Sequence, residues 1–240
     1  MRSFLMACVM SLGIMTATVD VASAAFIDTT GSWDVNTGVG PFGRPSYSTL
    51  GQTFTTPADN QLDDFTFYII RSPFSGNDPF NFVAIVMQWN GTNVTGPVLF
   101  ESGLQTFTAT DLKFYPITIN TGGLTLTAGQ QYVAFFTVAN TPGQPGLYAS
   151  SPTNNSTYWG YTGRDSYTGG GLVYSNSGSS FPNSGWSIHP FSNDLAFQMN
   201  FSSTSPPTNV VPAPPGLLMV LTGLPVLGLI RRFRRTAAGA

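Results

Sequence analysis

The chain has 240 residues, a formal net charge of −2, and charged side chains at only 8% of its positions. Between residues 25 and 209 ten acidic side chains face four basic ones, which gives −6, and the only cysteine of the chain is Cys8. Phosphate recognition needs clustered Lys and Arg, so this composition argues against nucleic-acid binding. One histidine, His189, and no cysteine after Cys8 also argue against a zinc site and a thiol nucleophile.

Residues 1–24 are typical of a secretory signal peptide. Arg2 supplies the positive start, residues 4–18 are mostly apolar, and Ala22, Ser23 and Ala24 match the small-x-small cleavage pattern. We therefore expect an N-terminal signal helix that is removed after Ala24 or one residue later. Cys8 lies within the apolar run rather than at its end, which does not suit a lipoprotein cleavage site.

Residues 25–202 show strand patterns and almost no helical repeat. An alternating strand is expected over 62–70, with Phe65, Phe67 and Ile69 on one face. Pro116 suits an edge strand or a bulge, because proline cannot donate to the ladder. Further strands are expected at 51–55, 80–89, 98–101, 114–119, 124–126, 130–138, 172–174 and 194–201, with turns at 90–91 and 120–123. This order predicts an all-β fold, an antiparallel β-sandwich with jelly-roll-like connections.

Residues 141–190 are rich in Gly, Ser, Asn and Tyr, and we expect them to form long loops at one edge of the sandwich. Flat sugar faces can stack on tyrosine and tryptophan rings while amides bind hydroxyls. The competing interpretation is that these rings pack against the core, because aromatic side chains bury large apolar areas. The candidate ligand-binding residues are Asn154, Asn155, Tyr158, Trp159, Tyr161 and Arg164.

Catalytic patterns are weak. Asp63 and Asp64 are the only adjacent acids, and neighbours in a strand point to opposite faces, so they cannot face one substrate together. His189 has no Gly-x-Ser-x-Gly element to work with. We therefore expect no catalytic residues and a non-enzymatic protein, with a secreted hydrolase acting on glycans as the alternative.

No cofactor is expected, with one open alternative. Aspartate oxygens can bind a structural calcium ion, although the chain has no EF-hand spacing. The aspartates considered for such a site are Asp28, Asp34, Asp78, Asp165 and Asp194.

The C-terminal tail predicts where the protein goes. Residues 203–215 form a proline-rich linker, and residues 216–230 form an uncharged apolar run that predicts a transmembrane helix. Fifteen residues span only about 22 Å as a helix, short of a hydrocarbon core of about 30 Å. A transient sorting segment therefore fits better than a permanent anchor, which is the alternative. The basic residues that follow, and that stay cytoplasmic, are Arg231, Arg232, Arg234 and Arg235.

The order of Val211, Pro212, Ala213 and Pro214, then the apolar run, then the arginine cluster, resembles the PEP-CTERM sorting signal over residues 211–235. Members of that family are exported proteins of Gram-negative bacteria, often ones that make exopolysaccharide. The resemblance implies an inner-membrane intermediate, cleavage near the Pro-x-Pro element by an exosortase-type membrane protease, and a final place in the cell envelope or outside the cell. Ala213 stands where the family typically has glutamate.

The body of the chain is similar to a β-sandwich type found ahead of such tails. The stretches that carry this likeness are residues 51–54, 89–91, 129–133 and 194–197. Together the two resemblances imply an exported cell-envelope or extracellular-matrix protein, with exopolysaccharide as a candidate partner.

Overall fold

The computed structural model describes residues 24–45, 47–73, 79–151, 157–182, 185–189 and 193–203. The expected signal peptide up to residue 23 and the tail from residue 204 lie outside these residues, so the signal helix and the transmembrane helix stay predictions. Within the described ranges, no helix is both long and apolar enough to cross a bilayer.

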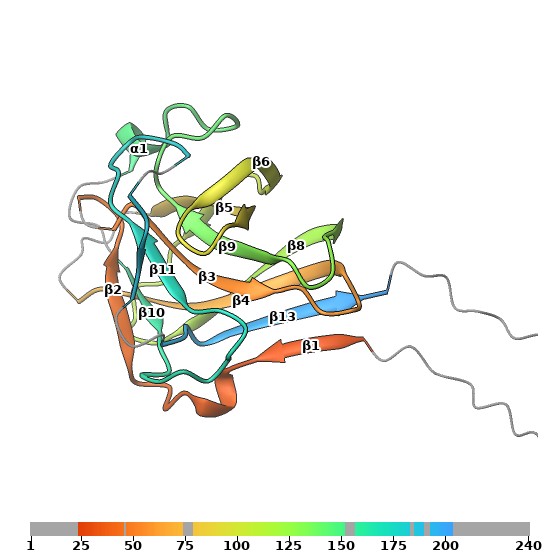
Figure 1. Cartoon of the computed structure of the whole chain (residues 1–240). Helices are drawn as coiled ribbons and strands as arrows, with labels where there is room; N and C mark the ends of the chain where they lie inside the picture. Colours follow the sequence, from red (N-terminus) through yellow and green to blue (C-terminus); the bar gives the residue numbers. More distant parts are fainter. Residues whose placement is uncertain are drawn as a thin grey trace, which may run out of the picture. The chain divides into compact units, whose positions relative to one another are not determined.

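The described strands form two sheets, and every strand pair in them is antiparallel (Figure 1). The six-stranded sheet has the order β1 (Ala25–Asp28), β13 (Phe197–Ser202), β4 (Gln61–Arg71), β10 (Thr157–Gly160) and β2 (Gly38–Phe42), with β8 (Tyr115–Thr125) paired to β4. The seven-stranded sheet has the order β12 (Ser187–Ile188), β11 (Leu172–Ser175), β3 (Thr49–Thr55), β9 (Gln131–Thr137), β5 (Phe80–Trp89) and β6 (Val94–Glu101), with β7 (Gln105–Phe107) paired to β5. The helical pieces are short: a 3-10 turn at Thr30–Ser32 and α1 at Leu147–Ser150. The expected all-β sandwich class is confirmed.

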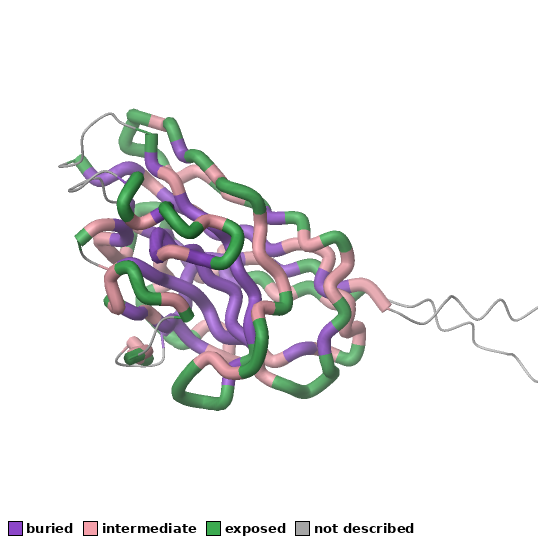
Figure 2. The backbone as a smooth tube through the Cα atoms, turned by 90° about the horizontal axis from the view of Figure 1, so that it is seen from above, coloured by how far each residue is buried: buried purple, intermediate pink, exposed green. Residues whose placement is uncertain are grey.

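The main core lies between the two sheets, where Figure 2 shows the buried backbone. Phe65, Phe67 and Ile69 alternate along β4 and are all fully buried, as their period of two predicts. Across the core, Phe67 meets Phe136 of β9 at a ring distance of 5.3 Å, and Phe136 stacks on Phe82 of β5 at 4.5 Å.

The seven-stranded sheet is also covered on its outer face. The outward residues of β5, among them Val83 and Ile85, form a second buried cluster with Leu147 of α1 and the rings of Phe181 and Trp186. Burial on both faces explains why β5 and β9 read as continuous apolar runs in the sequence. The outer face of the six-stranded sheet is less covered, because residues of β8 and β13 alternate between buried or half-buried and exposed positions.

Residues 120–123 do not form the expected turn. They lie inside β8, which continues to Thr125 and pairs with β4 over its length. The register shifts opposite Leu62 and Asp64, and Gly122 and Gly123 take positive φ angles of 72° and 81° there. The two glycines thus indicate a bulge here and not a chain reversal. Sequence alone does not distinguish the two, because bulges and tight turns both place glycine at positive φ angles.

Residues 141–190 are not only loops. They contain β10, β11 and β12, and β10 lies between β4 and β2 inside the six-stranded sheet. Four residues are too few to show a clear period, so tertiary pairing rather than local pattern creates this strand.

Gly51 allows β3 and β9 to approach closely. A Cβ atom at this position would lie 2.5 Å from both the carbonyl oxygen of Ala134 and the Cβ of Phe135. We expect Gly51→Ala to lower the free energy of unfolding by roughly 1–3 kcal/mol, because the neighbouring backbone must shift. Gly31→Ala is the matched control, since its Cβ would meet no atom within 4 Å. Equal urea midpoints for the two variants would contradict this account.

Candidate functional site: an aromatic groove on the six-stranded sheet

The loop between β1 and β2 is closed by its own hydrogen bonds. The Asp34 carboxylate accepts from the backbone N–H groups of Asn36 and Thr37, at 2.9 and 2.7 Å, and from the Thr37 hydroxyl at 2.8 Å. These bonds, led by the one from Asn36, lower the pKa of Asp34 below its ordinary value. The indole Nε1 of Trp33 donates to the carbonyl oxygen of Thr37 at 2.8 Å, so the loop also fixes this ring.

Val35, at the tip of this loop, has a φ angle of 58° and a side chain that is 63% exposed. A β-branched residue is strained in the left-handed region, and such strain persists only when the surroundings enforce it. Here the hydrogen bonds of Asp34 enforce it, so an apolar side chain is held out in water.

We expect Val35→Asn to raise the free energy of unfolding by roughly 0.5–1.5 kcal/mol, because asparagine tolerates the left-handed region far better than valine. Thermal unfolding of the two proteins measures this. Val39→Asn is unsuitable as a control because Val39 packs against the core, so Leu104→Asn, at a side chain that is 46% exposed, serves instead. An equal rise in the free energy of unfolding of both variants would mean that the replacement of an exposed apolar side chain by a polar one is responsible, and not the relief of backbone strain.

The groove lies beside this loop, on the outer face of the six-stranded sheet. Two hollows of about 460 and 300 Å³ share Asn36, Ile70, Leu112 and Phe114, so they adjoin each other. We define the aromatic groove by the following residues: Trp33, Tyr68, Ile70, Leu112, Phe114 and Tyr158.

Strand alternation builds the floor of the groove. In β4 the half-buried Tyr68 and Ile70 alternate with buried core residues, and in β10 Tyr158 pairs in register with Ile70. The Trp33 ring contacts the rings of Phe114 at 4.8 Å and Tyr68 at 5.3 Å. Three chain segments that are distant in sequence thus place their aromatic side chains together.

Glycines in β2 make room for the Tyr158 ring. A Cβ at Gly40 would lie 2.8 Å from Cδ1 of Tyr158, and one at Gly38 would lie 3.1 Å from the Phe114 ring. The sequence of β2 therefore keeps this end of the groove open for the two rings.

A hydrogen-bond chain connects the groove to β13. The Tyr68 hydroxyl donates to Oε1 of Gln198 at 3.2 Å, and Nε2 of Gln198 donates to the Asp28 carboxylate at 3.2 Å. Burial and the negative charge of Asp28 raise the pKa of Tyr68, so its hydroxyl is protonated at neutral pH. Burial by itself would raise the pKa of Asp28. Hydrogen bonds from Thr30 and Gln198 outweigh burial, so the pKa lies below its ordinary value.

Asp63 and Asp64 do not point to opposite faces, and that prediction was wrong. Asp64 accepts from Nδ2 of Asn200 at 2.8 Å and Asp63 from the Ser202 hydroxyl at 2.9 Å. Asn200 and Ser202 lie two residues apart on the outer face of β13, so both carboxylates reach that face. A bulge in β4 causes this: Leu62 and Asp64 pair with the adjacent residues Phe201 and Asn200 of β13, so Asp63 is an extra residue that breaks the alternation. Both acids bind β13, and neither lines the groove.

The predicted ligand residues do not form one cluster. Trp159 is fully buried, with its ring 4.8 Å from Phe67 and 4.9 Å from Phe136, so it cannot present a face to a sugar. This corrects its assignment as a ligand residue, and the competing interpretation as a core residue is right for it. The physical reason is strand alternation: in β10 Trp159 points inward while Tyr158 points into the groove.

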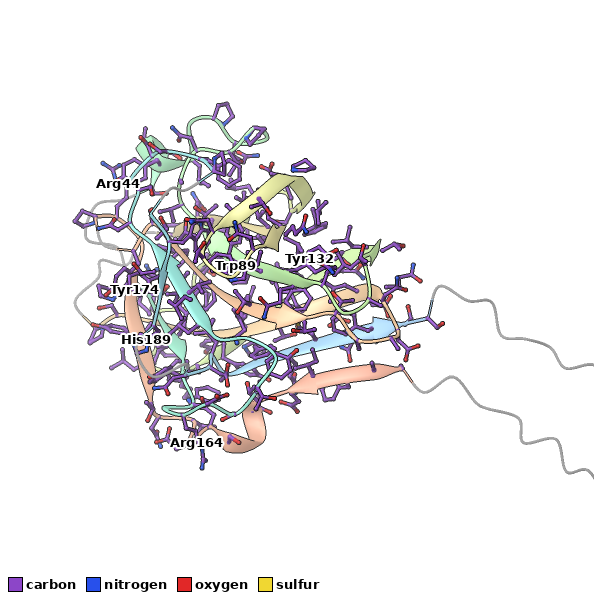
Figure 3. All side chains as sticks on the ribbon, in the orientation of Figure 1. Arg44, Trp89, Tyr132, Arg164, Tyr174 and His189 are labelled. Atoms are coloured by element: carbon purple, nitrogen blue, oxygen red, sulfur yellow. The ribbon has the colours of Figure 1, made fainter. Side chains whose placement is uncertain are left out.

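The remaining candidates lie elsewhere. The Tyr161 hydroxyl accepts from Nδ2 of Asn193, and its ring packs edge-on against His189 at 5.4 Å. The guanidinium of the exposed Arg164 donates to the carbonyl oxygen of Ser32 at 2.9 Å (Figure 3). Asn154 and Asn155 lie outside the described residues. Of the candidates, only Tyr158 lines the groove, and Trp33, Tyr68 and Phe114 were missed because no local motif connects them.

Asp194 is a buried acid, and the only role that the sequence suggested for it was that of a calcium ligand. Its carboxylate accepts from the backbone N–H groups of Ser166 and Tyr167, at 2.6 and 2.7 Å, and from Nε2 of Gln52 at 2.8 Å. Burial raises its pKa to about 6, against the effect of these hydrogen bonds and with a contribution from Asp165. N–H donors surround this carboxylate, which is the environment of a structural acid and not of a metal ligand.

The described part of the chain contains no group of three or more His, Cys, Asp or Glu side chains that could hold a metal ion. Asp78, one of the aspartates considered for calcium, lies outside that part. Comparison of the chain with protein-family models gives no match, and comparison with curated proteins gives none either.

Proposed function

We propose that this chain is an exported, non-enzymatic protein of the cell envelope or extracellular matrix, with a jelly-roll-like β-sandwich that binds polysaccharide. The observation that carries the binding function is the aromatic groove on the outer face of the six-stranded sheet. A pocket with several aromatic walls and a few polar groups is the usual form of a ligand site. The groove is lined mainly by aromatic and aliphatic side chains, which suits binding better than acid–base catalysis.

Export and sorting follow from the two ends of the chain. The signal peptide directs export and is cleaved after Ala24 or one residue later, and the PEP-CTERM-like segment 211–235 holds the protein in the inner membrane until an exosortase-type protease acts on it. Ala25 pairs with Phe201, so the chain enters and leaves the sandwich at the same end. This arrangement suits a domain that is held by a single linker over residues 203–215.

Mass spectrometry of both ends tests the sorting function. After expression in a Gram-negative host with an exosortase, we expect a mature N-terminus at Ala25 or Phe26 and a C-terminus near Pro212 to Pro214. Replacing all four arginines of the tail by glutamine is expected to prevent C-terminal processing, because the basic cluster stops transfer across the membrane. A reporter fused after residue 203 that is active only in the cytosol would contradict the proposal.

Release of sugar from neutral or acidic glycans tests the enzymatic alternative. We expect none from the wild-type chain, because Asp63 and Asp64 are each bound to a side chain of β13 and His189 packs against Tyr161. Glycan hydrolysis that Asp63→Asn or Asp64→Asn abolishes, with unchanged thermal unfolding, would replace the proposal by a hydrolase.

A further inference from the structure

We infer that the aromatic groove binds an uncharged hexopyranose polysaccharide, whose sugar faces lie on the rings of Phe114 and Tyr158 and against Leu112. This inference deepens the proposed function and rests on it, since it names the ligand class and the site. Three properties of the groove lead to it: its shape, its exposed apolar rim and the charge around it.

The shape suits a chain-like ligand. The two hollows, of about 460 and 300 Å³, adjoin at Ile70 and Phe114, and their linings together extend from the Trp33 loop to Tyr158. Each is within the range of about 300–1,000 Å³ that is usual for small-molecule sites. Neighbouring hollows of this size can hold successive rings of one polymer, whereas a single compact ligand would need only one of them.

The rim exposes apolar side chains that the fold does not need to expose. Leu112 is 62% exposed and Val35 is 63% exposed, and both line the larger hollow together with Trp33, Tyr68 and Phe114. Contiguous apolar surface of this kind on a soluble domain usually marks a binding site. The strain at Val35 supports this reading, because the hydrogen bonds of Asp34 hold that side chain out where a ligand would cover it.

The surrounding charge decides the class of polysaccharide. In the described part of the chain no carboxylate lines either hollow, although Asp34 belongs to the loop that carries Trp33 and Asp28 is connected to Tyr68 through Gln198. Two bases line the hollows, Lys113 and Arg71, but Arg71 is buried and its Nε donates to the carbonyl oxygen of Ala109 at 3.3 Å. Among the described lining residues, which are mostly aromatic and aliphatic, Lys113 is thus the one exposed charge. This gives an acidic polymer few ionic partners and suits an uncharged polymer better.

Polar partners for sugar hydroxyls lie at the border of the rings. The amide of Asn36 is part of both hollows, and from Tyr68 in the larger hollow a hydrogen-bond chain runs through the Gln198 amide to the Asp28 carboxylate. Carboxylates only accept hydrogen bonds and amides do both, which matches the donors and acceptors of neutral sugars. A neutral pyranose chain has apolar ring faces and hydroxyl groups, and the aromatic rings and polar side chains of the groove can contact both.

The test is biolayer interferometry of the full chain in detergent on immobilised hydroxyethyl cellulose, dextran and galactomannan, with alginate as the acidic polymer. We expect binding to at least one neutral polymer and none to alginate at about 0.15 M salt, where nonspecific attraction of alginate to distant basic groups is screened. Leu112→Ser and Tyr158→Ala should each weaken the apparent Kd about tenfold, a ratio equivalent to about 1.4 kcal/mol. Leu104→Ser is the matched control, because Leu104 is an exposed leucine outside the groove.

Several results would overturn the inference. These are no binding to any neutral polymer, equal losses in Leu112→Ser and Leu104→Ser, tighter binding to alginate, or dimers of the chain that Leu112→Ser dissociates. Leu112 is exposed, so its variant should unfold at the wild-type temperature, and a loss of binding then reports on the site. An exported chain that binds alginate but no neutral polymer defeats this inference alone, and one that binds no polymer also removes the binding part of the proposed function. A cytosolic reporter defeats the export and sorting part even if the purified chain binds glycan.

Discussion

Trp159→Ala should lower the free energy of unfolding by about 3–5 kcal/mol, the usual range for removing a large buried aromatic side chain. The Trp159 ring is fully buried and contacts the rings of Phe42, Phe67 and Phe136 at 5.4, 4.8 and 4.9 Å. These three residues belong to β2, β4 and β9, so the indole joins both sheets, and the cavity left by alanine cannot be filled from one side. Since domains are stable by only about 5–15 kcal/mol, this single change removes a large share.

Two further variants test whether the loss of stability comes from the buried indole of Trp159 or from any aromatic side chain in this part of β10. The indole Nε1 of Trp159 is buried and has no hydrogen-bond partner among the described residues. Trp159→Phe should therefore cost less than Trp159→Ala, because it removes an unsatisfied donor together with part of the volume. Tyr158→Ala, one residue away on the groove side, should cost less as well. Urea unfolding measures all three, and a loss for Tyr158→Ala as large as that for Trp159→Ala would mean that Trp159 is not the central core residue.

Stability should fall as the pH rises from about 4 to about 7, because of Asp194. Its carboxyl is fully buried in the fold, and its pKa of about 6 lies above the ordinary value of 3.8. The folded protein therefore binds a proton that the unfolded chain has released, and this contribution is complete below pH 4 and lost as the pH passes 6. We expect a decrease of roughly 1–3 kcal/mol over this window, from the free energy of a pKa shift.

Asp194→Asn is the control for this pH effect, because its amide does not titrate. The slope of the free energy of unfolding between pH 4 and 7 should largely disappear, although Nε2 of Gln52 loses its acceptor and the absolute stability changes too. The lowered pKa values of Asp28 and Asp34 act in the opposite direction but only below about pH 4, where their carboxylates become protonated. A wild-type slope that persists in Asp194→Asn would assign the effect to another group.

Asp194 also shows why a buried acid is hard to find from sequence. It follows a polar segment and precedes a strand, like many loop aspartates, and nothing nearby indicates that Ser166 and Tyr167 will donate to it. Its partner Gln52 lies 142 positions away in β3 and also accepts from the N–H of Leu195. Only the packing of β3 against this loop creates the site.

The sequence by itself determined the features that depend on local period. An alternation of two placed Phe65, Phe67 and Ile69 on the core face of β4, and the apolar run at 80–89 matches β5 at both ends. Pro116 correctly indicated an edge strand, since among the described strands β8 pairs extensively only with β4. The expected signal peptide and sorting tail also come from local patterns, and they stay predictions.

The tertiary structure alone decided which side chains meet. In the structure β10 lies between β4 and β2, Trp159 points inward and Tyr158 outward, and a bulge in β4 brings Asp63 and Asp64 to one face. The aromatic groove combines a loop before β2, the outer face of β4, the segment before β8 and one residue of β10. Register and strand order fix such a combination, and both depend on contacts between residues far apart in the chain, which a periodic pattern does not encode.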